Sequence, residues 1–404
     1  MRKCSRGFTA AILDFQTGQL SVYNSFALFM LTHIPKLAAN LSARWNCLSA
    51  LIFFREAKHN PRMAEGNPQA AAVALGLRVA SASSICLVVT ELFHLQQAAL
   101  GVYTAHLVMV LFPITSFQKG VERFLGRGLG LFYGLILVST CLDVPLLFLT
   151  LVMLGQIISC YIYLSGRLAY AALMAALFVG VMAGFGLTAP ATTLPYFWHA
   201  IVQLLLGEAA AFFVNWITGA ERTVSLTVAG EKLFPLRADW LNIGFMLSVS
   251  QMTTLFATLL LDLPITPTMI SALIIGITAG SAEAAWHKAR QRALGAWLGG
   301  GYAFAAILIL RLVPFFNLFL VLVFFAMFLA AYGARTSAAN SYVYLQMGLV
   351  APLVLVGPTG DIGSITLAIQ RLVGVWVGLL IAQAVSLAWP HAKIPAPAYA
   401  AQPK

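Results

Sequence analysis

The chain has 404 residues, of which 60% are hydrophobic and 9% carry a charge, and its mean hydropathy is +0.88. A soluble protein of this length has too small an interior to bury so much apolar surface, so the composition excludes the soluble classes and predicts an integral membrane protein. The formal net charge of +11 does not indicate a nucleic-acid partner, because the Lys and Arg residues gather in short loops between apolar runs, as on the cytoplasmic side of membrane proteins.

Residues 1–62 differ from the rest of the chain. They contain no apolar run of about 20 residues and no small-residue cleavage site behind a signal-peptide core. Met63 begins a polar leader, MAEGNPQ, that continues directly into the first apolar helix. We expect translation to begin at Met63 and residues 1–62 to be a dispensable or disordered extension. The alternative is an amphipathic segment at the membrane interface.

Apolar runs of about 20 residues, the length that crosses the hydrocarbon core, occur six times before a polar linker at 218–241 and six times after it. The chain therefore divides into a first membrane repeat at 63–217, a second at 242–390 and a tail at 391–404. The linker is too short for a soluble domain. The expected spans are 76–94, 97–115, 125–142, 144–163, 167–187, 196–217, 242–261, 266–282, 294–312, 314–332, 340–357 and 365–389.

One segment occurs twice, 169 residues apart, as KGVERFLGRGLG at 119–130 and KARQRALGAWLG at 288–299. Six residues are identical in one register, and each copy stands between two apolar runs. The repetition predicts an all-α polytopic membrane protein of about 12 transmembrane helices in two six-helix repeats. Because each repeat has an even number of spans, the two are parallel and related by a pseudo-twofold axis along the membrane normal.

The charged residues of the loops predict the orientation in the membrane. Basic residues fall on one side of the spans, whereas the opposite loops carry Arg311 with several acidic residues, so both termini are expected in the cytoplasm. Lys119, Arg123, Lys288 and Arg292 form a cytoplasmic basic motif. We expect these four side chains at the headgroup level, where they would fix the orientation and bind anionic lipid; a gating role is the alternative.

Small residues recur every four positions on one face of three expected helices. This spacing lets helix backbones approach closely, which is how helices associate in lipid. We therefore expect a helix-packing role for Gly126, Gly130, Gly134, Gly295, Gly299, Gly374 and Gly378.

Polar side chains inside the expected spans are costly there and persist only with a partner or a function. Glu208 lies near the middle of the sixth span, and Arg371 lies near the second turn of the twelfth. An unpaired charge at this depth costs at least ~2.5 kcal/mol, so the two mark either a substrate or proton path or a structural ion pair. Glu208 and His106 are the candidates for proton coupling. The candidates for substrate binding are Arg371, Gln370, Gln203 and Trp198.

A basic loop runs into a glycine-stepped third span as Arg123-x-x-Gly126-x-x-x-Gly130, and the pattern returns in the second half with Arg292 and Gly295. This pattern, in tandem six-span units, resembles the fusaric acid resistance and aromatic acid exporter family over most of the chain after Met63. The resemblance implies an efflux protein of the bacterial inner membrane that uses the proton gradient to expel aromatic or other small organic acids and related toxic compounds. Besides the lipid bilayer, the expected partners are a periplasmic adaptor, an outer-membrane channel and further copies of the chain.

Two features depart from that family. The chain lacks the sizeable cytoplasmic domain of many members. The first helix opens with Leu77-Arg78, as in that family, whereas Leu247 stands where the second half would match Arg78. One alternative is a major facilitator, which also has two parallel six-span halves. Another is a non-transporting membrane scaffold. The sequence contains no HExxH or GxSxG motif, no metal-ligand spacing and no Walker A loop, so we expect neither an enzyme nor a cofactor or metal site.

Overall fold

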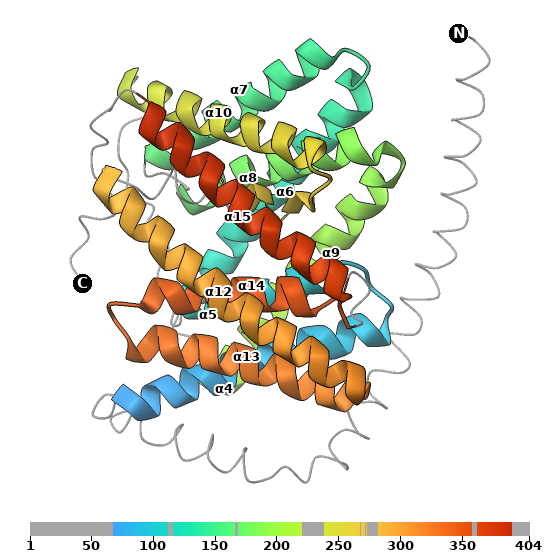
Figure 1. Ribbon diagram of the computed structural model, residues 1–404, viewed down its shortest axis with the longest axis vertical. Coiled ribbons are helices and arrows are strands. Elements are labelled where there is room, and N and C mark those ends of the chain that lie inside the picture. Colours follow the sequence, from blue (N-terminus) through green and yellow to red (C-terminus); the bar gives the residue numbers. More distant parts are fainter. Residues whose placement is uncertain are drawn as a thin grey trace. The chain divides into compact units, whose positions relative to one another are not determined.

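The computed structural model shows a bundle of apolar helices (Figure 1). The extension predicted at 1–62 and the tail predicted at 391–404 lie outside the described residues, as does most of the linker 218–241. The described residues are 68–111, 116–165, 169–219, 238–266, 268–270, 272, 282–357 and 362–389. The helices are α4 (Pro68–Leu92), α5 (Ala98–Leu111), α6 (Ser116–Cys141), α7 (Pro145–Leu164), α8 (Ala169–Thr188), α9 (Thr193–Ile217), α10 (Ala238–Leu260), α12 (Ala282–Leu312), α13 (Phe316–Thr336), α14 (Ser341–Leu355) and α15 (Ile365–Ala388), with a 3-10 turn η1 (Pro190–Thr192).

Within the described part of the chain, nine helices are long and apolar enough to cross a membrane. Eleven of the expected spans coincide with a helix, and the twelfth, at 266–282, falls mostly outside the described residues. The all-helical membrane class is therefore confirmed.

Helix α14 packs against α5 and is shorter than the span expected for it, with 15 residues. At 1.5 Å per residue it covers about 22 Å, less than the ~30 Å of the hydrocarbon core. Helix α14 ends early because Pro352 lies in its last turn, Val356 is extended, and the chain turns back to form a bridge with Ile362. Both helices are buried along nearly their whole length and contact each other.

The glycines of the first repeated motif lie where α6 crosses α8. A Cβ atom added at Gly126 would overlap the backbone of Ala171, and one added at Gly130 would overlap that of Ala175. The two helix backbones thus touch, which only glycine at these positions allows. Gly134, one turn further along α6, lies against the side chain of Met182.

The glycines of the second repeated motif lie where α12 crosses α14, in the same kind of close backbone contact. Gly295 packs against the backbone of Val343, and Gly299 packs against that of Met347. On α15, Gly374 and Gly378 are buried, and Gly374 lies against the hydroxyl of Thr268.

Contacts between the halves are reciprocal (Figure 1). Helix α4, the first of its half, packs along α13, the fourth helix of the other half, while α10 packs along α7 in the same way. Within each half, a tyrosine ties the third helix to the fourth: Tyr133 Oη donates to Leu151 O at 2.8 Å, and Tyr302 Oη donates to Leu322 O at 2.7 Å. The two tyrosines stand 169 residues apart, the offset of the repeated motif.

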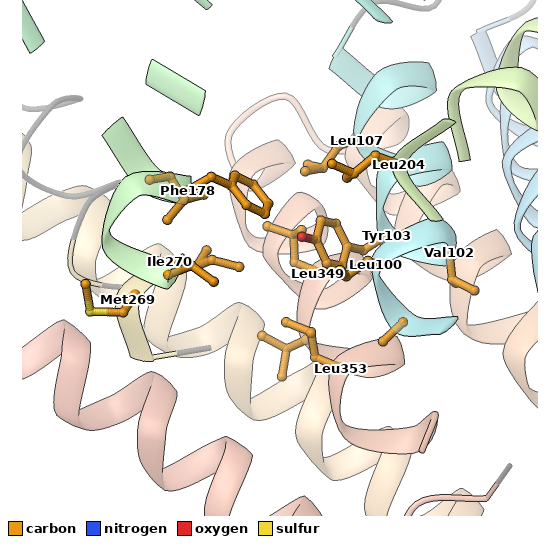
Figure 2. Packing of buried hydrophobic residues seen from close by; sticks show 14 of the residues in the cluster. Leu100, Val102, Tyr103, Leu107, Phe178, Leu204, Met269, Ile270, Leu349 and Leu353 are labelled. Atoms are coloured by element: carbon orange, nitrogen blue, oxygen red, sulfur yellow. The ribbon is translucent and has the colours of Figure 1, made fainter. Parts of the chain in front are cut away.

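One hydrophobic core joins the halves. Figure 2 shows a part of it, where buried side chains of α5, α8 and α9 meet those of α14 and of Met269 and Ile270. Arg127, described next, lies beside these side chains, because its aromatic neighbours Tyr103 and Phe178 are among them.

Candidate functional site

Helix α6 carries two buried arginines. Arg123 and Arg127 each expose only 1% of their surface, although they are among the largest side chains of the protein. They lie four residues apart on the face that also holds Gly126 and Gly130, so the close approach of α8 covers them. We call Arg123 and Arg127 the arginine pair.

The sequence predicts Arg123 at the headgroup level. Its side chain is buried between helices, as is that of its counterpart Arg292 in α12, which exposes 2%, and the depth of both in the membrane stays a prediction. Lys288, one turn earlier, is only partly buried. The side chain of Lys119 lies outside the described residues. The membrane side on which the basic motif lies stays a prediction.

Arg123 faces α8. Its Nη1 donates to the hydroxyl of Tyr170 at 2.7 Å, and its guanidinium carbon lies 5.8 Å from the centre of the Tyr170 ring. A guanidinium this close to an aromatic ring is stabilised by the ring quadrupole.

Arg127 lies between α5 and α8. Its Nη1 donates to Thr104 Oγ1 at 2.7 Å, and Thr104 itself donates to the carbonyl of Leu100 at 2.5 Å. The guanidinium carbon is 5.6 Å from the ring centre of Tyr103 and 5.4 Å from that of Phe178. Figure 2 shows these two rings among buried apolar side chains. The charge of Arg127 is therefore held by a hydroxyl and two aromatic rings.

Glu208 of α9 belongs to the same cluster. Its side chain packs beside Gly120, whose added Cβ would lie 3.8 Å from Glu208 Cγ, and Gly120 precedes Arg123 by about one turn. Arg123 acts electrostatically on the Glu208 carboxylate. Glu208 Oε1 is buried and has no hydrogen-bond partner among the described residues. The carboxylate is therefore held near a cation while one of its oxygens remains unsatisfied.

His106 of α5 is fully buried, and Arg123 acts electrostatically on it as well. Its imidazole ring fills the space left by the missing side chain of Gly348 on α14. The two proton-coupling candidates from the sequence, His106 and Glu208, thus share one cationic neighbour. His106 also stands at the contact between the two halves.

Gln203 ties three helices together. Its Nε2 donates to Thr90 Oγ1 at 3.1 Å and to the carbonyl of Gln96 at 3.0 Å, and its Oε1 lies close to Gly101. These contacts fix the beginning of α5 against α4 and α9. Gln203 has a structural position here, and its contact with substrate stays a prediction.

Arg371 has backbone partners. Its Nη1 donates to the carbonyls of Leu353 and Val356, the second at 2.7 Å, where α14 ends. A cation is favourable at this place because the carbonyl dipoles of a helix point toward its C-terminus. Its neighbour Gln370 is partly buried, and Trp198 on α9 exposes 45% of its surface.

Residues 252–385 match the family model described as fusaric acid resistance protein-like. The second half of the chain carries a fusaric acid resistance protein-like domain. The resemblance seen in the sequence is thus confirmed for this segment, which runs from α10 into α15. No curated protein and no solved structure matches the chain.

The fusaric acid resistance protein-like domain holds a single buried arginine where the first half has a pair. Arg292 Nη1 donates to Gln346 Oε1 at 2.5 Å, and the guanidinium also interacts with the Tyr342 hydroxyl. Tyr342 corresponds to Tyr170 of the first half. Ala296 stands at the position of Arg127.

The sequence analysis did not predict that Arg127 and its aromatic neighbours form a site. A signal was present, because Arg127 falls inside the expected span 125–142, and a charge within a span indicates function. Tyr103, Tyr170 and Phe178 gave no such signal, since aromatic residues are common in any apolar helix. In the described part of the chain, no group of three or more His, Cys, Asp and Glu side chains could hold a metal ion.

Proposed function

We propose that this protein is an efflux transporter of the inner membrane that exports small organic acids, aromatic carboxylic acids in particular. The observation that carries the proposal is the match of residues 252–385 to fusaric acid resistance proteins in a chain with nine apolar helices among the described residues. Buried ionisable groups within such helices support transport, because they are costly in a membrane and mark substrate or ion paths. The match favours this family over a major facilitator.

We infer that the chain is built from two parallel six-helix repeats. Tyr133 and Tyr302 make the same hydrogen bond in their halves, and Gly126 and Gly295 make the same helix crossing, each pair being 169 residues apart. A duplicated unit predicts such recurrence, whereas unrelated halves have no reason to share it. The positive-inside pattern supports cytoplasmic termini. A periplasmic adaptor, an outer-membrane channel and further copies of the chain remain the partners we propose.

Export is proposed to be driven by protons through Glu208, with His106 as the second candidate. The ionised Glu208 offsets the charge of Arg123, and protonation of Glu208 removes that offset. The proton on Glu208 thus changes the net charge around Arg123 as the carboxyl group cycles between its neutral and ionised forms, which is the change that a proton-coupling residue has to make.

The experiment is transport of radiolabelled benzoate in proteoliposomes with an imposed pH gradient. Glu208→Gln keeps the size and the hydrogen-bonding capacity of the side chain but cannot exchange a proton, so gradient-driven transport should be lost while protein abundance and insertion stay normal. Glu91→Gln, near the end of α4, is the matched control and should transport normally. Full gradient-driven transport by the Glu208→Gln variant would refute the assignment. A non-transporting scaffold predicts no benzoate transport even by the unaltered protein.

A further inference from the structure

The arginine pair has hydrogen-bond donors that the protein leaves unused. The Nε atoms of Arg123 and Arg127 are both buried, and neither has a hydrogen-bond partner among the described residues. The hydroxyl of Tyr103, whose ring lies against Arg127, is also buried without a partner there. Most buried polar groups in proteins have a hydrogen-bond partner, so three unused donors on two neighbouring arginines and an adjacent tyrosine point to a missing acceptor.

The two buried arginines also leave an excess of positive charge. Arg123 and Arg127 contribute two positive charges, and the Glu208 carboxylate acts on Arg123. The hydrogen-bond and ring partners described for the two guanidinium groups are neutral hydroxyls and aromatic rings. A buried cation that no opposite charge matches is strongly unfavourable, because it has lost its hydration. The missing acceptor is therefore expected to be an anion.

The second half shows what the same position looks like without this excess. It has one buried arginine, Arg292, and Ala296 takes the place of Arg127. The amide oxygen of Gln346 accepts a hydrogen bond from Arg292. The corresponding residue of the first half, by the offset that relates Tyr170 to Tyr342, is Met174, which offers no such oxygen. Compared with the second half, the first half thus has one more buried cation, Arg127, and lacks the acceptor that Gln346 provides.

We propose that Arg123 and Arg127 bind the carboxylate of a small aromatic acid, with the two Nε–H groups and the Tyr103 hydroxyl as donors. A guanidinium binds a carboxylate through paired N–H groups, and the apolar side chains around Tyr103 and Phe178 (Figure 2) suit an aromatic ring. Arg127 lies about 10 Å along α6 from Gly120, where the apolar segment begins, so the site lies within the membrane.

This site occurs in the first half only, since Arg127 has no counterpart in the second half. The site deepens the proposed function, because it names residues that would hold the acid. Only the claim that the bound acid is also the transported substrate rests on the proposed function. The site itself requires no transport, so binding and transport can be tested separately.

The test is equilibrium binding of radiolabelled benzoate to the purified full chain in detergent, with benzamide as a neutral competitor of the same shape. Arg127→Ala introduces the residue type that stands at the corresponding position of the second half, so a folded variant is expected. It should bind benzoate at least about tenfold more weakly, the size expected for a charged hydrogen-bonded pair. Arg127→Gln, which keeps a donor toward Thr104, is the second variant, and it should lose binding similarly. Arg292→Gln is the matched control in the other half and should retain binding.

The proposal is overturned if both Arg127 variants bind benzoate with unaltered affinity or if benzamide competes as well as benzoate does. It is also overturned if the unaltered protein binds no benzoate, or if binding is lost in Arg371→Ala and kept in Arg127→Ala. Benzoate binding that depends on Arg127, without transport in proteoliposomes, would support the site and refute the proposed function. Normal transport after loss of binding in Arg127→Ala would refute the site as the substrate site and leave the transporter in place.

Discussion

Replacing Gly126 with alanine tests whether α6 and α8 touch through their backbones. In the structure an added Cβ at Gly126 would lie 2.6 Å from both the carbonyl carbon and the Cα of Ala171, distances that real Cβ atoms do not adopt. Gly301 of α12 is the matched control, because an added Cβ there would meet no atom within 4 Å. Both positions lie inside a helix, so both variants gain the same helix propensity, up to ~1 kcal/mol.

The difference between the two variants therefore isolates the steric cost at the helix crossing. Inserting a methyl group into a packed interior costs about 1–3 kcal/mol, and the upper part of this range is expected here since the obstacle is backbone, which cannot rotate away. Gly301→Ala should be as stable as the unaltered protein or up to ~1 kcal/mol more stable. Gly126→Ala should be about 2–3 kcal/mol less stable than Gly301→Ala.

The assay is unfolding of the purified variants in mixed micelles of mild detergent and SDS, followed by circular dichroism and checked for reversibility. Gly295→Ala should behave like Gly126→Ala, because its added Cβ would overlap the backbone of Val343 in the corresponding crossing. Equal stability of Gly126→Ala and Gly301→Ala would show that the two helices do not approach as the structure has them, and the reasoning would fail.

Two further predictions concern the repeat and the orientation. Tyr133→Phe and Tyr302→Phe each remove one hydrogen bond to a carbonyl of the next helix, so each should lower stability by about 0.6 kcal/mol. The double variant should show the sum, because the two bonds join different helix pairs and share no partner. A clear inequality between the two single variants would contradict equivalent roles. A cysteine introduced at 188–195 should react with impermeant thiol reagents added outside, and one introduced at 223–230 should not; the reverse labelling would invert the orientation.

Much of the fold could be predicted from the sequence because the membrane imposes local rules. A helix must satisfy its backbone hydrogen bonds within itself and must be about 20 apolar residues long, and both properties can be read along the chain. Eleven expected spans are helical for this reason. The glycine spacing likewise pointed to positions that lie at helix crossings, including Gly126 and Gly295.

The end of α14 could not be predicted in the same way. An apolar run at 340–357 suggested a full span, whereas the helix ends at Leu355 and its last carbonyls accept from Arg371. The partner lies in another helix, so no window along the sequence contains both groups. The role of Arg371 at this helix end depends on how α15 is docked.

The candidate site shows where sequence reasoning ends. The sequence by itself determined that Glu208 lies in an apolar span and that a basic motif occurs twice, since these are properties of single helices. Only the tertiary structure decided that Arg123 and Arg127 are buried, that Glu208 lies beside Arg123, and that Tyr103 lies against Arg127. The physical reason is that each helix can rotate about its axis without changing its hydropathy, and the rotation that packs α6 on α8 is set by contacts between residues distant in sequence.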